Sequence, residues 1–133
     1  RHGWKESLSD MLVFDAVLRH TDRHLGNFGF LVDSHTNKLL QPAPIFDNGL
    51  SLYCYALDSD LANIPQQEKT LSPALYADFD EVARHVMEAK QREALRHLLN
   101  FHFKKHPRYN LRSQRLHLLE AAIQSKARAL LDC

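Results

Sequence analysis

The sequence predicts a mainly α-helical domain of the α+β class with one small antiparallel β-hairpin. Three stripes of apolar residues recur at helical spacing in the second half of the chain, within residues 79–87, 95–103 and 116–130. Apolar residues alternate over 28–32, turn-forming residues fill 33–37, and a second short strand is predicted from residue 38 to 41. We therefore expect helices to build the core and a hairpin near residues 28–42 to carry polar loops.

The first predicted element is a buried helix. Residues 11–18 are apolar at every position except Asp15. Ser7 and Asp10 have the spacing of a capping box, which predicts that the helix begins beside Ser7. The pattern ends near Arg19 and His20, and glycines shortly afterwards indicate a loop.

Three further helices are predicted after a polar connector over residues 53–71, which we expect to be mobile. Ser72 and Pro73 resemble an N-cap followed by proline in the first helical position. The second stripe is expected to run on to His106-Pro107, where proline would stop the helix. The apolar positions predicted to form the core are Phe79, Val82, Ala83, Val86, Met87, Leu95, Leu98, Leu99, Phe103, Leu116, Leu119, Ile123, Ala127 and Leu130.

Length and composition predict a single domain over residues 1–133, long enough for a hydrophobic core. The chain begins with arginine, so we expect it to be a piece of a longer polypeptide. No stretch resembles a signal peptide or approaches the roughly 18–20 apolar residues of a membrane span. The two cysteines, Cys54 and Cys133, provide no disulfide framework, which predicts a reducing, cytoplasmic setting.

Charge is divided unevenly along the chain. Residues 1–89 hold 7 Lys/Arg against 13 Asp/Glu, whereas residues 90–128 hold 10 against 2. A basic half of this kind is compatible with a solvated helix face. It is also compatible with a docking surface for nucleic acid or an acidic partner.

Two short segments carry the chemistry. The first is His20–Gly29, and the second is Pro44–Gly49, which contains Asp47-Asn48-Gly49. Asp22 and Asn27 stand five residues apart, which is the spacing of the protein-kinase loop H-R-D-x-x-x-x-N. In that loop the aspartate accepts the proton of the substrate hydroxyl and the asparagine holds a magnesium ion. The D-x-G of the second segment matches the other metal ligand, and Mg²⁺ prefers oxygen ligands, so Asn27 and Asp47 are the predicted metal pair.

Neighbouring residues admit more than one interpretation. His24 follows Asp22 by two residues, where a cation or hydrogen-bond donor can face the transferred phosphate; a loop-stabilising hydrogen bond is the alternative. His20 and His24 stand four apart and raise a zinc alternative, but no third ligand is evident. Taken singly, an aspartate after a helix, an asparagine before a strand and an Asp-Asn-Gly tripeptide are ordinary turn residues. Their order and spacing together favour a phosphoryl-transfer site.

These segments resemble the large lobe of HipA-like kinases, the bacterial serine/threonine kinases of toxin–antitoxin modules. The resemblance rests on Asp22-Arg23-His24 with Asn27-Phe28, followed after the hairpin by Ala43-Pro44-Ile45-Phe46-Asp47, and covers roughly residues 8–52. It implies a catalytic core over residues 1–52, with ATP and Mg²⁺ as cofactors and Ser/Thr of a protein as acceptor. It also implies catalytic roles for Asp22 and His24, metal binding by Asn27 and Asp47, and cofactor binding by Asn27, Asp47 and Ile45.

Other partners and activities fit the same residues. An antitoxin or a nucleic acid is a candidate partner of the basic region 90–128. Phosphatidylinositol kinases carry a similar G-D-R-H-x-x-N loop, so a lipid or small-molecule kinase is the second hypothesis. A non-catalytic, kinase-derived interaction module is the third.

The sequence also departs from the kinase pattern. Thr21 replaces the arginine of H-R-D, and Asn48 stands where D-F-G has phenylalanine. The chain has four glycines, none of them in a G-x-G-x-x-G or P-loop cluster, and no lysine lies in a clear strand before the catalytic loop. We therefore expect little kinase activity from this chain alone, and an N-terminal nucleotide-binding lobe from the same or another polypeptide.

Overall fold

The fold of residues 3–132, described here by a computed structural model, is mainly helical. Within this range five α-helices and one short 3₁₀ helix accompany a single two-stranded antiparallel sheet. The predicted α+β class with a small hairpin is thereby confirmed. None of the helices in the described part of the chain is both long and apolar enough to cross a membrane.

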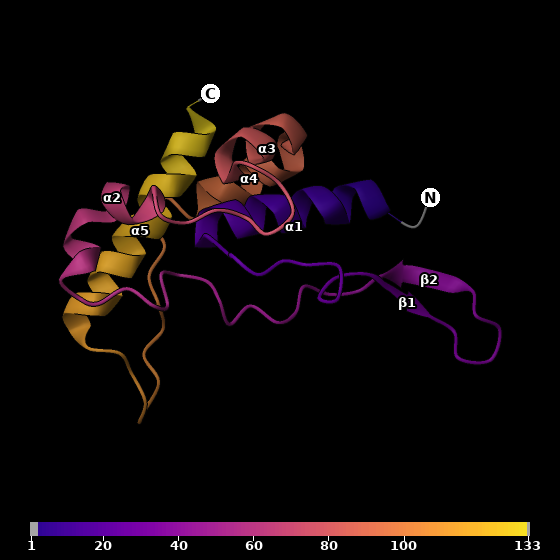
Figure 1. Cartoon of the computed structure of the whole chain (residues 1–133), viewed down its shortest axis with the longest axis horizontal. Coiled ribbons are helices and arrows are strands. Elements are labelled where there is room, and N and C mark those ends of the chain that lie inside the picture. Colours follow the sequence, from indigo (N-terminus) through magenta and orange to yellow (C-terminus); the bar gives the residue numbers. More distant parts are fainter. Residues whose placement is uncertain (1–2, 133) are drawn as a thin grey trace.

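Helix α1 (Trp4–Leu18) lies alongside α3 and α4 and contacts α3, α4 and α5 (Figure 1). The predicted capping box at Ser7 and Asp10 is wrong, because the helix begins one turn earlier. Gly3 is its N-cap in a left-handed conformation (φ 67°) that favours glycine, and the Ser7 amide donates to the Gly3 carbonyl at 3.0 Å. The helix ends where predicted, with Arg19 left-handed at φ 53°.

The hairpin extends away from the helices (Figure 1). Strands β1 (Phe30–Val32) and β2 (Leu39–Pro42) pair antiparallel, with Phe30 opposite Pro42, which confirms the predicted hairpin. Its turn is closed by the Asp33 carboxylate, which accepts hydrogen bonds from the amides of His35 at 2.8 Å and Thr36 at 2.9 Å. The hairpin therefore depends on local turn chemistry rather than on burial.

Helix α3 (Phe79–Val86) begins later than predicted. The Asp78 carboxylate caps it by accepting from the Glu81 amide at 2.8 Å, so the predicted start at Ser72-Pro73 is wrong. Helix α4 (Ala89–His97) has a capping box formed by Glu88 and Gln91. It ends at His97, not at Pro107. The hydrogen bonds there join residues three apart, as in a 3₁₀ turn, for example from the Leu98 amide to the Leu95 carbonyl.

Helix α5 (Ser113–Leu131) completes a core shared with α1, α3 and α4. The buried hydrophobic members of this core are Val13, Ala16, Val17, Phe79, Ala83, Met87, Leu95, Ile123, Ala127 and Leu130. The three predicted stripes thus each supply core residues. Burial of such side chains contributes about 25 cal/mol per Å² of apolar surface removed from water, which makes this core the main source of stability.

The segment predicted as a polar connector contains two short helices, η1 (Asp60–Asn63) and α2 (Ile64–Glu68). It also contributes Tyr53 and Leu61 to a second buried cluster with Leu119 and Ala122 of α5. Sequence periodicity did not predict this anchoring. Cys54, in the same segment, is a free and exposed thiol; Cys133 lies outside the described residues.

A partly buried ionic cluster fixes the end of α1 against α2, α3 and α5. Arg19 donates to both carboxylate oxygens of Asp80, at 2.9 and 2.7 Å, and to Glu68 at 3.3 Å. Lys126 donates to the same two carboxylates, at 2.9 and 3.1 Å. Burial alone would raise the pKa of Asp80, but the hydrogen bonds and charges of Arg19 and Lys126 prevail and lower it from its ordinary value. The residue directly before the candidate catalytic loop is therefore held rigidly.

Candidate active site

The loop that follows α1 is joined to the Asp47 segment by the buried imidazole of His20. His20 Nδ1 accepts a hydrogen bond from the Asp22 amide at 3.1 Å. Since this nitrogen is the acceptor, the neutral ring carries its proton on Nε2, which donates to the Asp47 carbonyl at 2.8 Å. One side chain thus connects the backbone of the predicted catalytic base to that of the predicted metal ligand.

Arg23 forms a buried ion pair with Asp15 of α1. Its Nε and Nη2 donate to the two oxygens of Asp15, at 3.0 and 2.9 Å, in a bidentate pair. The side chain of Asp15 is fully buried and that of Arg23 is 2% exposed. A buried pair is stable only when its remaining hydrogen-bonding capacity is also satisfied.

The remaining donors of Arg23 meet that requirement and bind both halves of the candidate site. Nη1 donates to the carbonyls of Asn27 at 3.1 Å and Phe46 at 2.7 Å, and Nη2 donates to Asn48 Oδ1 at 2.8 Å. Arg23 therefore holds the 20–29 loop against residues 46–48. The sequence pattern assigns no role to Arg23 or Asp15, although a lone carboxylate within the apolar run 11–18 indicates a buried partner.

Asn27 is buried and its amide is held in one orientation. Its Nδ2 donates to the Asp22 carbonyl, so the amide oxygen faces the other way. That oxygen, Oδ1, is buried and has no hydrogen-bond partner among residues 3–132. Buried polar atoms are rarely left unpaired, and an unexplained one indicates a missing ligand or water. A carbonyl oxygen of this kind is a ligand that Mg²⁺ accepts.

Asp47 is an exposed residue in a left-handed conformation, at φ 54°. Aspartate tolerates this region better than most residues, and such backbone conformations are frequent at functional sites. Two backbone hydrogen bonds hold the following residues beside the loop, from the Thr21 amide to the Leu50 carbonyl at 3.0 Å and from the Leu52 amide to the Leu18 carbonyl at 2.7 Å. The loops bearing Asp22, Asn27 and Asp47 are therefore bonded to one another.

His24 makes the loop-stabilising hydrogen bond that was one of its two predicted roles. Its Nδ1 accepts from the Gly26 amide at 3.0 Å, which places the proton of a neutral ring on Nε2. Nε2 lies 3.8 Å from Asp22 Oδ2, and both side chains are about half exposed, at 50% and 45%. A Cβ at position 26 would stand 2.9 Å from His24 Cε1, so glycine leaves the space that the ring occupies. Contact of His24 with a phosphate stays a prediction.

Ile45, the remaining predicted cofactor contact, is partly exposed and lines an open groove of about 700 Å³. The groove runs between the first turns of α1 and the hairpin, and its other apolar walls include Trp4, Met11, Phe28 and Pro44. Apolar walls with a few polar side chains, here Ser7, Asp10 and Gln41, are typical of small-molecule sites in proteins.

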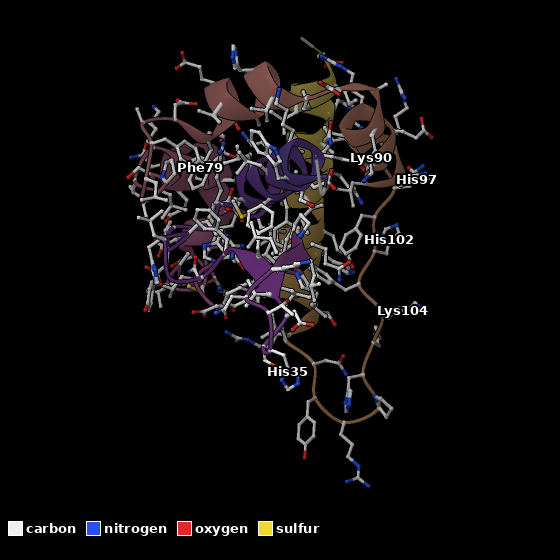
Figure 2. All side chains as sticks on the ribbon, turned by 90° about the vertical axis from the view of Figure 1, so that its right-hand side faces the viewer. His35, Phe79, Lys90, His97, His102 and Lys104 are labelled. Atoms are coloured by element: carbon white, nitrogen blue, oxygen red, sulfur yellow. The ribbon has the colours of Figure 1, made fainter. Side chains whose placement is uncertain are left out.

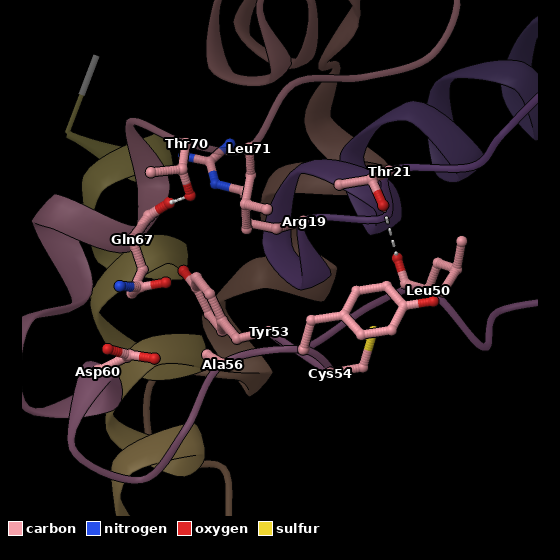
Figure 3. Close-up of a pocket in the computed structure, with 11 residues that line it drawn as sticks. Arg19, Thr21, Leu50, Tyr53, Cys54, Ala56, Asp60, Gln67, Thr70 and Leu71 are labelled. Atoms are coloured by element: carbon pink, nitrogen blue, oxygen red, sulfur yellow. Dashed lines mark hydrogen bonds between the residues drawn. The ribbon is translucent and has the colours of Figure 1, made fainter.

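A second pocket, of about 150 Å³, opens beside Thr21, next to Asp22 in the chain (Figure 3). The Thr21 hydroxyl donates to the Leu50 carbonyl at 3.4 Å on one side of the pocket. Residues of the 53–71 segment form the opposite wall, among them Tyr53, Gln67 and Thr70. This segment therefore lies within reach of the candidate loop.

The zinc alternative gains no support. His20 uses both ring nitrogens in the bonds described above. Across residues 3–132, no three His, Cys, Asp or Glu side chains are grouped so that they could hold a metal ion. The predicted magnesium pair, Asn27 and Asp47, is not a group of this type, because one of its two ligands is the amide oxygen of an asparagine.

Comparison with known proteins supports a kinase relationship. The chain is 35% identical over 82 residues to the Serine/threonine-protein kinase CtkA of Helicobacter pylori. The match covers 62% of this chain and 22% of that protein, so the chain spans about a fifth of the length of the curated relative. No family model matches the chain, and no solved structure matches it. The sequence is thus related to that of a protein kinase.

Proposed function

We propose that this chain is the catalytic lobe of a HipA-like kinase, which transfers the γ-phosphate of ATP to a serine or threonine hydroxyl of a protein. One observation carries the proposal: Asn27 Oδ1 is buried without a partner among the described residues, in a loop whose backbone is clamped to the Asp47 segment. The relationship to a serine/threonine kinase supports it.

In the proposed mechanism Asp22 accepts the proton of the attacking hydroxyl. Its carboxylate is partly exposed, while its backbone is fixed on both sides, by His20 at the amide and by Asn27 at the carbonyl. A base fixed in this way contributes by orientation as well as by proton transfer.

Asn27 Oδ1 and the Asp47 carboxylate are the groups that would hold Mg²⁺. When bound, the ion would neutralise charge on the phosphates. The rigid clamp around Arg23 and His20 would keep the two oxygen ligands in place before nucleotide arrives. His24 Nε2, which lies on the Asp22 side of its ring, would donate a hydrogen bond to the transferred phosphate.

The nucleotide and the acceptor protein would bind to two different surfaces. Ile45 and the groove beside the hairpin would contact the adenine, and the pocket of Figure 3 would receive part of the acceptor protein. The chain carries no glycine-rich phosphate loop, so a separate nucleotide-binding lobe would complete the site.

Transfer of radiolabelled phosphate from ATP tests the proposal. The 133-residue chain, alone and within a longer polypeptide that supplies a nucleotide-binding lobe, would be assayed with protein substrates. We expect little transfer by the chain alone. In the longer polypeptide Asp22→Asn should reduce the rate by at least about 100-fold. Asp132→Asn, at an exposed carboxylate far along the chain from the loop, is the matched control. Equal rates in the two variants would refute the assignment of Asp22.

A further inference from the structure

We propose that residues 104–112, which we term the basic finger, form a docking surface for a nucleic-acid duplex. From residue 94 to residue 119 the chain contains no aspartate or glutamate. The same stretch holds the cationic residues Arg96, Lys104, Lys105, Arg108, Arg112 and Arg115, together with His97, His102, His106 and His117. Arg96, Arg112 and Arg115 are ion-paired with Glu93 or Asp58. The charge that remains available to attract polyanions is therefore that of Lys104, Lys105 and Arg108.

The finger projects from the helical body between α4 and α5 (Figure 1). His97, His102 and Lys104 lie along one edge of the molecule, and the loop continues outward beyond Lys104 (Figure 2). Every residue from 104 to 112 is exposed. Within the described part of the chain, the side chains of Lys104, Lys105 and Arg108 take part in no hydrogen bond or ion pair, so their charges are available to a partner.

Both ends of the finger are anchored. On one side the Phe103 amide donates to Glu120 at 3.0 Å and Gln124 donates to the Phe101 carbonyl at 2.8 Å, which ties the chain to α5. At the other end Arg115, in α5, donates to the carboxylate of Asp58 at 2.9 Å. The cations are therefore presented from a fixed base, which lowers the entropy lost on binding.

The tip is ordered by its own polar groups. The Asn110 side chain accepts from the His106 amide at 2.8 Å and donates to the His106 carbonyl at 2.7 Å. The His106 ring stacks on Tyr109, with centroids 5.4 Å apart. Because that contact occupies one face of Tyr109, the tip offers no series of free rings on which successive bases could stack.

These features favour a duplex over the other polyanions. Protein interfaces are depleted in lysine at their centre and use apolar anchors, whereas the finger is cationic, with Tyr109 and Leu111 as its exposed large hydrophobic residues. Single strands are bound through stacking on several aromatic residues, which this loop lacks. A narrow, projecting cationic loop suits the phosphates that line a groove. The inference is independent of the proposed kinase activity.

Fluorescence anisotropy with labelled duplexes of roughly 20 base pairs, about two helical turns, tests the inference. DNA and RNA duplexes would be titrated separately with the 133-residue chain at low ionic strength, so that the two sources of phosphate are distinguished. The test variant is Lys104→Gln/Lys105→Gln/Arg108→Gln. The control is Lys38→Gln/Lys69→Gln/Arg84→Gln, which removes the same charge from exposed positions elsewhere.

We expect the finger variant to bind at least one duplex about tenfold or more weakly, with the control within about threefold of the unmodified chain. The slope of log K against log salt should also become shallower by about 0.9 for each phosphate that the variant no longer neutralises. Three results would overturn the inference: no duplex binding at low ionic strength, equal weakening by both triple variants, or tighter binding of single strands or of polyglutamate than of either duplex.

Discussion

His20 Nε2 donates a hydrogen bond of 2.8 Å to the carbonyl of Asp47, while Nδ1 of the same ring accepts from the Asp22 amide. The His20 side chain is fully buried, whereas the two backbone partners lie at the edge of the loop, where the bonds are partly buried. One imidazole therefore links the backbones of the two candidate aspartates.

Removing that imidazole should destabilise the fold. In His20→Ala the Asp22 amide and the Asp47 carbonyl each lose a hydrogen bond, at about 0.5–1.5 kcal/mol apiece, and a cavity replaces the buried ring. We expect the free energy of unfolding, measured by urea titration, to fall by at least about 2 kcal/mol. His85→Ala, at an exposed position of α3, should be nearly neutral. Similar losses of unfolding free energy in His20→Ala and His85→Ala would contradict a stabilising role of the two His20 hydrogen bonds.

The Arg23–Asp15 pair should show strong coupling. Arg23→Met leaves the Asp15 carboxylate buried and without its ion-pair partner, which typically costs about 3–5 kcal/mol, a large part of the stability of a small domain. The double variant Arg23→Met/Asp15→Leu removes both charges and should recover part of that loss, because the oxygens of Asn27, Phe46 and Asn48 still lack the Arg23 donors. A double-mutant cycle of urea unfolding measures the coupling; additive single and double effects would contradict a buried, mutually dependent pair.

The fold was predictable where one local pattern dominates. The stripe that includes Phe79 and Ala83 predicted a buried helix face, and the turn residues after Val32 predicted the hairpin. Helix starts were less predictable because several residues compete as caps. Gly3 and Asp78 are the caps, not Ser7 and Ser72, since capping depends on which residue adopts the required backbone conformation.

The spacing of Asp22, Asn27 and Asp47 indicated a candidate site because those residues match a linear motif. The network that holds them was not predictable in the same way. Arg23 and His20 bind partners as far as 27 residues away, and local periodicity does not encode such pairing. A single carboxylate in an apolar helix predicts a partner without identifying it.

Gly26→Ala should displace His24 with little effect on stability. A methyl group at position 26 would stand 2.9 Å from the His24 ring, and this half-exposed side chain can move away. We expect the free energy of unfolding to change by less than about 1 kcal/mol. The ring resonances of His24 should shift in NMR spectra. Gly29→Ala, where a methyl group meets nothing within 4 Å, is the control and should leave them in place. An unmoved His24 signal in Gly26→Ala would contradict the described contact.

Stability should fall in acid partly through Asp80. The pKa of Asp80 is lowered in the folded state from its ordinary 3.8, so the unfolded chain binds the proton first as the pH falls. The contribution of Asp80 is therefore fully present well above pH 3.8 and is lost as the pH drops through the lower folded pKa. Unfolding free energies measured against pH should decline less steeply in Asp80→Asn than in Asp132→Asn. Identical slopes of unfolding free energy against pH in the two variants would show that Asp80 does not contribute to the loss of stability in acid.

Binding of Mn²⁺, a paramagnetic substitute for Mg²⁺, tests the candidate metal pair most directly. In amide-detected NMR spectra of the 133-residue chain, low Mn²⁺ concentrations should broaden first the signals of residues close to Asn27 Oδ1 and the Asp47 carboxylate. Asn27→Ala and Asp47→Asn should each abolish this selective broadening, whereas Asp132→Asn should preserve it. Broadening that centres on other carboxylates, or that persists in both site variants, would contradict a metal site formed by Asn27 and Asp47.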